Sequence, residues 1–399
     1  MIDISKDKCC GCSSCVNICP KQCIQMKSDI DGFDYPIVNT RNCINCGLCE
    51  NVCPAINKPN KSKKDSVEAC IARHLDENIL AYSTSGGFFY GVCQYVINKN
   101  GIVYGVTLDE QFEVKHARAT SLTECKKFMG SKYVQSSIGS TYCDVKSDLD
   151  MGVLVCFSGT PCQVEGLYSF LKGKNYDNLI LVDIVCHGVV SGTVWKKYIE
   201  YEREKNHKDI QEFQFRSKKY GYQNSTMKIC AGDKEFYNTS RTNPYLKIFY
   251  SNIALRDSCY NCSSKSINRI SDFTIFDSWN AASIIEEKDD DKGYTNVIIQ
   301  SDKGRTIIQY LKQFMIIKEV NVETIIPKNG GMVTNSARRN PHREDFLNEI
   351  REKSFKIAFD KYLPVRKIDY VIEKLKLLLC KSSLLRRLSK IKRNILRRA

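Results

Sequence analysis

Long hydrophobic runs are missing from this sequence. The strongest apolar stretches, 179–186 and 377–380, are far shorter than the roughly 20 residues that span a bilayer, so we expect no membrane-crossing helix. The chain also begins Met1-Ile2-Asp3, without the basic and apolar segments of a secretory leader. We therefore expect a cytoplasmic protein whose 21 cysteines, an odd number, are kept as thiols.

Features of nucleic-acid recognition are also lacking. The formal net charge is +15, but residues 366–398 hold twelve Lys and Arg against Asp369 and Glu373, a local balance of +10. Two-thirds of the excess charge therefore lies in this tail, and no ordered pattern of basic and aromatic recognition residues accompanies it. We expect no nucleic-acid partner.

The basic tail carries an apolar stripe at helical spacing, made of Leu384, Leu385, Leu388, Ile391 and Ile395. A basic amphipathic helix can lie on an anionic membrane surface, which predicts peripheral contact with the inner membrane surface. The alternative is a solvated helix that packs on the body or on an acidic partner.

The sequence contains two copies of one cysteine motif. The segments from Cys9 to Pro20 and from Cys43 to Pro54 each spell C-x2-C-x2-C-x3-C-P. Four thiolates at this spacing can converge on a [4Fe–4S] cubane, and in duplicated motifs the fourth cysteine ligates the opposite cluster. We therefore predict two clusters, one held by Cys9, Cys12, Cys15 and Cys53, the other by Cys43, Cys46, Cys49 and Cys19.

Two alternatives exist for these cysteines. Disulfides are disfavoured in a reducing compartment, and the ligand pairs of zinc would leave the third and fourth thiolates of each motif unexplained. Cys10 and Cys23 fall outside the ligand pattern, and we interpret both as packing residues. Seven further cysteines are expected in the core: Cys70, Cys93, Cys125, Cys143, Cys156, Cys230 and Cys380.

A third set of cysteines follows a predicted βαβ unit. The apolar runs 153–157 and 179–186 predict parallel strands joined by a helix over 161–171, with a capping box from Thr160 to Gln163. Cys162 then lies in the first helical turn, where the helix dipole favours a thiolate, and Cys186 leaves the next strand at its carboxyl end. Together with Cys259-x2-Cys262, these two cysteines predict a third [4Fe–4S] site. One alternative is a structural zinc site, and another is that Cys162 and Cys186 only pack in the core.

The remaining segments mix both kinds of secondary structure. Asp31-Gly32 predicts a hairpin turn between the two cysteine motifs, 88–97 a helix, and 102–108 a strand. Residues 272–276 and 297–300 resemble strands, and 346–399 is mostly helical. We expect an α+β fold: a dicluster ferredoxin-like domain, a mixed α/β catalytic-type domain with a βαβ unit, and a basic helical tail.

Five ordered motifs carry a resemblance to a known family. They are Ser83-Thr84-Ser85-Gly86-Gly87, Gly130-Ser131-Lys132-Tyr133-Val134-Gln135-Ser136, Ser158-Gly159-Thr160-Pro161-Cys162-Gln163-Val164, Asp183-Ile184-Val185-Cys186-His187-Gly188-Val189 and Cys259-x2-Cys262. At these residues the chain resembles the beta-subunit family of coenzyme F420 hydrogenases and dehydrogenases, which includes F420-dependent sulfite reductase modules and a chlorophyll-cycle reductase. The resemblance covers roughly residues 1–300.

The resemblance implies FAD beside a [4Fe–4S] cluster, with the flavin exchanging hydride with a deazaflavin or reducing a tetrapyrrole. It places flavin contacts at Ser85, Gly86, Gly87, Gly130, Ser131, Lys132, Tyr133 and Gln135. From the residues alone, Ser85-Gly86-Gly87 opens a helix whose N-terminus suits a phosphate, although a simple cap is more usual. The chain departs from the family's Gly-Asp-x-Trp-Gly at Phe276-Asp277-Ser278-Trp279-Asn280, which leaves the substrate open.

Domain boundaries follow from these features. We expect a ferredoxin-type domain at 1–57, a linker at 58–66, two regions at 67–150 and 151–330 that are similar to the N-terminal and C-terminal parts of the family's proteins, and the tail at 331–399. The expected function is an iron–sulfur flavoprotein oxidoreductase that links an F420-like carrier, NAD(P)H or ferredoxin to an organic substrate. The alternative is a non-catalytic electron-relay subunit of a larger enzyme.

Overall fold

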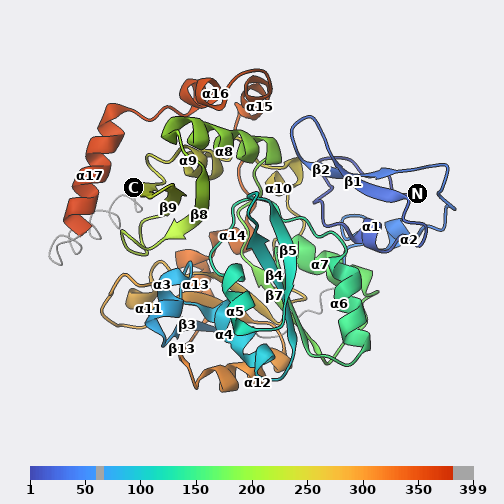
Figure 1. Ribbon diagram of the computed structural model, residues 1–399. Coiled ribbons are helices and arrows are strands. Elements are labelled where there is room, and N and C mark those ends of the chain that lie inside the picture. The colour runs from blue at the N-terminus through green and yellow to red at the C-terminus, as the bar shows by residue number, and fades with distance from the viewer. Residues whose placement is uncertain (60–66, 381–399) are drawn as a thin grey trace.

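The computed structural model describes residues 1–59 and 67–380 (Figure 1). Eight strands form its central sheet: β3 (Glu68–His74), β4 (Ile102–Leu108), β5 (Val114–Ala119), β6 (Val155–Gly159), β7 (Leu179–Ile184), β11 (Phe273–Asp277), β12 (Thr295–Ile299) and β13 (Met315–Val320). Their order is β13-β3-β12-β11-β7-β6-β4-β5. Neighbours among β4, β6, β7 and β11 pair in parallel, and the other pairs are antiparallel.

Helices cover both faces of this sheet because its strands are apolar on both sides. One face packs against α4 (Phe88–Ile97) and α12 (Asp302–Leu311). The other packs against α6 (Thr141–Asp150), α7 (Pro161–Phe170), α11 (Ala281–Ile284), α13 (Val322–Asn329) and α14 (Gly331–Thr334). Short elements connect them: α3 (Glu77–Tyr82), α5 (Leu122–Cys125), a 3-10 helix (Lys126–Phe128) and α10 (Asp257–Tyr260).

A second, smaller sheet lies above the central one in Figure 1. It contains β8 (Ile210–Ser217), β9 (Thr226–Ala231) and β10 (Lys234–Thr239) in the order β10-β9-β8. An aromatic-rich core joins it to α8 (Gly192–Asn206), α9 (Pro244–Ser251), α15 (Arg343–Glu352) and α16 (Phe355–Tyr362). The last described helix, α17 (Lys367–Cys380), runs beside this part.

The N-terminal segment projects from one side of the molecule (Figure 1). It consists of the antiparallel hairpin β1 (Ile24–Ser28) and β2 (Asp34–Val38), with α1 (Ser14–Asn17) and α2 (Leu48–Asn51). The hairpin turn predicted at Asp31-Gly32 is therefore confirmed. Apolar residues and cysteines form a small core of its own.

The expected α+β class is confirmed, and so is the βαβ unit, since β6, α7 and β7 have parallel strands and the capping box from Thr160 to Gln163. Strands from both expected regions, 67–150 and 151–330, share the central sheet. Residues 60–66 of the expected linker and residues 381–399 of the tail lie outside the described residues. Over the described part, no helix has the length and apolarity to cross a membrane.

Six of the seven cysteines expected in the core have described side chains, and these six divide into two groups; the side chain of Cys380 lies outside the described residues. Cys70, Cys93, Cys125 and Cys156 are fully buried within one apolar cluster, as predicted. The expectation is wrong for Cys143, which is exposed, and for Cys230, which is half-buried on β9, the middle strand of the small sheet. Both lie on surface elements whose apolar neighbours face the other way.

Candidate functional site

An inner pocket lies where the N-terminal segment meets the body. Its lining includes Cys9, Cys12, Cys15 and Cys53, the set that the motif spacing predicts for one cluster. The first three thiols are buried, and Ile2, Ile4, Met26 and Pro36 provide apolar walls. The hairpin and α1 thus bring the fourth cysteine of the second motif to the first three of the first motif.

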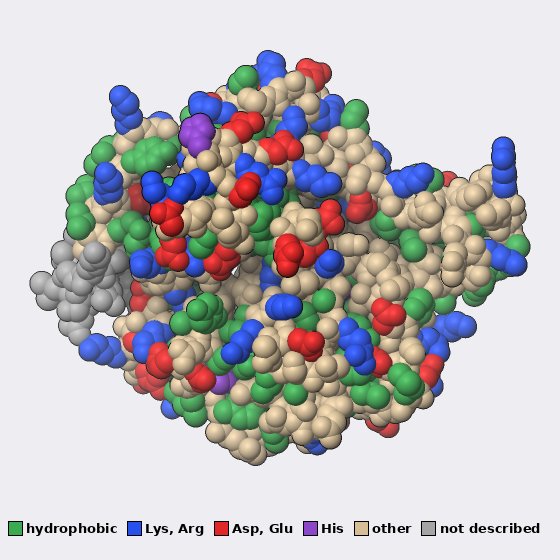
Figure 2. Space-filling view, in the orientation of Figure 1, with side chains coloured by type: hydrophobic (Ala, Val, Ile, Leu, Met, Phe, Trp, Pro, Cys, Tyr) green, Lys and Arg blue, Asp and Glu red, His purple; other side chains and the backbone are tan. Residues whose placement is uncertain are grey.

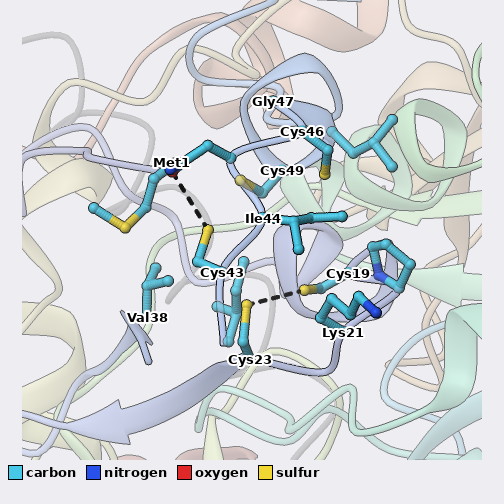
Figure 3. Close-up of a pocket in the computed structure, with 14 residues that line it drawn as sticks. Met1, Cys19, Lys21, Cys23, Val38, Cys43, Ile44, Cys46, Gly47 and Cys49 are labelled. Carbon is cyan, nitrogen blue, oxygen red and sulfur yellow. Dashed lines mark hydrogen bonds between the residues drawn. The ribbon is translucent and has the colours of Figure 1, made fainter. Parts of the chain in front are cut away.

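An outer pocket lies at the far end of the same segment (Figure 3). It is lined by Cys43, Cys46, Cys49 and Cys19, the other predicted set, together with Met1, Ile44 and Val38. Cys46 is exposed, and Ile44 is 58% exposed. Two residues of the outer pocket are therefore exposed to solvent, whereas Cys9 and Cys12 of the inner pocket lie against the body at Arg256 and Gly166.

A fifth thiol lines each pocket, in places that the sequence did not reveal. Cys10 belongs to the inner pocket and Cys23 to the outer one, where the Cys23 Sγ lies 3.4 Å from the Cys19 Sγ (Figure 3). Both residues were interpreted as packing residues. Cys23 is buried in the core of the segment, as that interpretation expects, and both residues also lie beside predicted ligands.

The N-terminal segment is held to the body through α7. Ser14 Oγ donates a hydrogen bond to the Gly166 carbonyl oxygen at 2.6 Å. A Cβ on Gly166 would lie 2.8 Å from Ser14 Oγ and 2.9 Å from Cys12 Cβ, so only glycine allows this approach. Because α7 also carries Cys162 in its first turn, the contact brings the two cysteine regions together.

Arg256, a residue that the sequence did not single out, fixes the same interface. Its side chain is 1% exposed and donates to the carbonyl oxygens of Cys9 at 3.1 Å and Asp34 at 2.8 Å. Its Nε donates to Gln135 Oε1 at 3.0 Å, and Gln135 Nε2 donates to the Cys10 carbonyl oxygen at 2.9 Å. The only sequence signal was its place three residues before Cys259.

The structure brings the third cysteine set together at the carboxyl edge of the central sheet. Cys162 follows β6, Cys186 follows β7, and Cys259 and Cys262 come from α10 and the turn after it. The Cys259 thiol interacts electrostatically with the other three. Residues about 100 positions apart in sequence thus form one thiol cluster.

Cys10 connects this cluster to the inner pocket. Its thiol lies close enough to the Cys12 and Cys162 thiols to shift the pKa values of both. A hydrogen bond from Cys10 lowers the pKa of Cys12 to about 7 and also lowers the pKa of Cys162. These two thiols are therefore the ones predisposed to ionise.

The other three thiols of the third set have raised pKa values. Burial raises the pKa of Cys186 to about 12 and raises the pKa values of Cys259 and Cys262. Without a bound cation these thiols stay protonated, whereas metal coordination deprotonates a thiol outright. His187, beside Cys186, pairs with Asn252 Oδ1 at 2.6 Å rather than with a sulfur atom.

The first motif assigned to flavin by resemblance lies at the same sheet edge, beside β3 and β12. Gly86 N donates to Thr295 Oγ1 at 2.9 Å, and Ser85 Oγ lies 2.9 Å from the same atom. The following residue, Gly87, is the N-cap of α4. The loop is thus anchored on the sheet, two strands from β7.

The second flavin motif, residues 130–136, contacts two different parts of the protein. Ser131 N donates to Thr84 Oγ1 at 2.8 Å, which joins the motif just after Gly130 to the first motif. Gln135, by contrast, contacts the N-terminal segment. Lys132 Nζ donates to the carbonyl oxygens of its own loop at Lys127 and Met129, and burial lowers its pKa to about 7. Lys132 therefore stabilises the loop rather than presenting a free cation.

A buried polar group lies next to this edge. Arg216 Nη1 pairs with Asp277 Oδ2 at 3.0 Å and donates to the Tyr133 hydroxyl at 3.1 Å, and its guanidinium lies 4.8 Å from the Trp279 ring centroid. Within the described residues, four buried atoms here have no hydrogen-bond partner: Arg216 Nη2, Tyr222 Oη, Ser278 Oγ and Asn296 Oδ1. Unpaired buried polar atoms are costly, so they fit a polar ligand bound at this edge.

The residues present fit iron–sulfur clusters. Over the described chain, no His, Asp or Glu belongs to the lining of these two pockets, so cysteine thiols are the main metal-ligating groups there, and apolar side chains surround them. In residues 1–59 and 67–380, no set of three or more Cys, His, Asp or Glu side chains is arranged for a single metal ion. The N-terminal segment is thus built as an iron–sulfur domain.

Comparison with family models identifies both parts. Residues 8–56 match the 4Fe-4S dicluster domain, and residues 153–324 match the C terminus of the coenzyme F420 hydrogenase/dehydrogenase beta subunit. Residues 153–324 are therefore similar to the C-terminal part of the coenzyme F420 hydrogenase/dehydrogenase beta subunit, and they follow a segment that matches a dicluster iron–sulfur domain. The resemblance seen in the motifs is confirmed.

One similar solved structure is a chain of the F420-reducing [NiFe] hydrogenase complex from Methanosarcina barkeri. It is 14% identical, with a TM-score of 0.42, and the match covers 76% of this chain and 93% of that chain. A TM-score this low does not by itself establish a shared fold. No curated protein sequence matches the chain significantly.

Proposed function

We propose that this chain is an iron–sulfur flavoprotein oxidoreductase that moves electrons between an external redox carrier and an organic substrate. The ligands would be the inner set Cys9, Cys12, Cys15 and Cys53, the outer set Cys43, Cys46, Cys49 and Cys19, and the third set Cys162, Cys186, Cys259 and Cys262. FAD would lie between the motifs at Ser85–Gly87 and Gly130–Gln135. Such a flavin converts between hydride and single electrons, and the clusters carry one electron each.

One observation supports the proposal above the others: Cys10 lies between a ligand of the inner set and a ligand of the third set. The three cysteine sets therefore form a continuous series, from the outer pocket to the edge of the central sheet. The exposed Cys46 makes the outer pocket the natural docking place for a protein or small-molecule carrier.

The chain's own residues complete the other end of the series. β11 lies next to β7, and Asp277 at its carboxyl end holds Arg216 beside Trp279. Thr295, paired with Asp277 across β11 and β12, holds Ser85 and Gly86. The unpaired Arg216 Nη2 and Ser278 Oγ offer hydrogen bonds to a flavin or to its substrate. The third set and the two flavin motifs thus share one edge.

The test is a cofactor analysis of anaerobically purified protein. We expect about twelve irons per chain, from three four-iron clusters, together with bound FAD. Cys259→Ser should remove about four irons, whereas Cys230→Ser, at a half-buried cysteine outside the three sets, should remove none. Reduced F420, NAD(P)H and ferredoxin would then be compared as electron donors.

Two other cofactor contents would change the proposed cofactors or the proposed function. Zinc bound in place of the last four irons would reject the third cluster but keep the dicluster domain. About eight irons without flavin would instead support a relay subunit that carries electrons to a separate enzyme.

A further inference from the structure

Helix α17 packs on the body through its acidic residues. Asp369 and Glu373 are both buried. Asp369 Oδ1 pairs with Arg241 Nη1 at 3.3 Å, and Glu373 Oε1 accepts a hydrogen bond from Thr239 N at 2.7 Å while its other oxygen accepts one from the Thr242 hydroxyl. These polar contacts fix the rotation of the helix on the small sheet.

The same rotation turns the aliphatic residues of α17 to solvent. Ile368, Val371, Ile372, Leu375 and Leu378 are between 37% and 63% exposed, and their spacing of three and four residues puts them on one side of the helix. We call this set the aliphatic face. Figure 2 shows hydrophobic side chains gathered along the edge where α17 lies. A surface helix usually buries its apolar side against the core, and α17 does the reverse.

Positive charge accompanies the aliphatic face along the sequence. The exposed Lys367 and Lys374 belong to the same helix. The chain then continues through residues 381–399, which hold eight Lys and Arg and no Asp or Glu: Lys381, Arg386, Arg387, Lys390, Lys392, Arg393, Arg397 and Arg398. An anionic partner therefore matches this end of the molecule.

We propose that the aliphatic face of α17 docks onto an anionic lipid surface, with the helix lying in the plane of that surface. Exposed aliphatic residues flanked by lysines are typical of interfacial helices. Protein-binding surfaces are instead enriched in aromatic residues, methionine and arginine. The aliphatic face itself has none of these, and the one exposed aromatic residue described on α17, Tyr370, is of a type that is also enriched at membrane–water interfaces. The docked body would keep its outer pocket free, because that pocket lies at the opposite end of the molecule in Figure 1.

The experiment is co-sedimentation of the full-length holoprotein with lipid vesicles. We expect binding to vesicles of phosphatidylglycerol and phosphatidylcholine, weakening as salt is added, and little binding to phosphatidylcholine alone. Val371→Ser combined with Leu375→Ser should weaken binding about tenfold or more, because two aliphatic side chains no longer enter the lipid. Ile357→Ser, at an exposed isoleucine of α16, is the matched control and should bind like the parent.

Three results would overturn the proposal. They are failure of the parent to bind either vesicle, equal binding to both vesicle types, and unchanged binding by the α17 variant. If the parent binds neither vesicle, the partner of the aliphatic face would instead be an acidic protein or residues 381–399 of the same chain. Far-ultraviolet circular dichroism of every variant checks that the fold is intact, and neither this check nor the sedimentation depends on the proposed redox function.

Discussion

The Arg256 guanidinium donates a hydrogen bond to the carbonyl oxygen of Cys9, 3.1 Å away, and so joins a residue of the body to the first predicted cluster ligand. The two residues are 247 positions apart. Since the Arg256 side chain also lies 4.6 Å from the Tyr35 ring centroid, it packs against the hairpin of the N-terminal segment. The inner pocket therefore depends on a residue that belongs to neither cysteine motif.

Replacing this arginine tests the interface. Arg256→Leu leaves the buried carbonyl oxygens of Cys9 and Asp34 without their donor, and we expect it to lower the free energy of unfolding by about 2–4 kcal/mol. Anaerobic urea unfolding followed by tryptophan fluorescence measures this change. Arg339→Leu is the control: Arg339 is 49% exposed and forms surface ion pairs, so its loss should cost less than about 1 kcal/mol. Equal effects of the two changes would contradict the role of Arg256.

The fifth thiols give a second prediction. If the proposed clusters are bound, Cys10 would have no open iron to bind and could donate its single thiol proton to the sulfur of Cys12 or of Cys162, which would favour the reduced, more negative cluster. Cys10→Ala should therefore lower the reduction potential of the inner or the third cluster by up to about 60 mV, a tenfold change in the reduction equilibrium. Redox titration followed by paramagnetic resonance measures the shift.

Cys23→Ala is the matched control for that experiment, because Cys23 contacts Cys19 in the outer pocket. It should move only the outer cluster's potential. Loss of about four irons from the Cys10→Ala protein would show that Cys10 is a ligand, and unchanged potentials would show that it only fills space. Cys10→Ser keeps a donor and should recover part of the shift.

The sequence could predict the local parts of this site but not their docking. The two motifs determine which thiols meet in each pocket, since short spacings restrict the loop, and the strand-helix-strand pattern put Cys162 and Cys186 at one edge. The contact of Cys10 with Cys162 spans 152 residues and depends on Ser14 and Gly166 at a tertiary interface. Arg256 gave no periodic signal, and the exposure of Cys143 depends on which side of α6 faces the sheet.

A third prediction concerns the loop assigned to flavin. A Cβ on Gly86 would lie 2.2 Å from the Ala72 carbonyl oxygen and 2.6 Å from Thr295 N, both backbone atoms of the central sheet. Gly86→Ala should push the loop off the sheet and weaken FAD binding about tenfold or more, while iron content stays at the parental level. Flavin released on denaturation, measured per chain after dialysis, reports the change. Gly331→Ala, at a glycine with open space around its Cβ position, should retain the flavin; full flavin in both variants would reject the placement.

The last prediction is a pH dependence set by His116. Its ring is stacked on Phe157, with centroids 5.0 Å apart, and its nitrogens pair with the Ser158 carbonyl oxygen and the Ser136 hydroxyl. Burial lowers the pKa of His116 from 6.5 to about 4. Below about pH 6.5 His116 takes up a proton in the unfolded chain, whereas in the folded protein it stays neutral until about pH 4. The free energy of unfolding therefore falls as the pH falls through this window.

Between about pH 7.5 and pH 5 this loss amounts to about 2 kcal/mol, since each unit below the unfolded pKa costs about 1.4 kcal/mol. His116→Phe keeps the aromatic stack and cannot take up the proton, so its unfolding free energy should fall less steeply over the same range. Comparing the two proteins by urea unfolding cancels the acid sensitivity that they share through their cofactors. His342→Phe changes an exposed histidine and should follow the parent. Parallel curves for the parent and His116→Phe would show that His116 does not resist protonation in the folded protein.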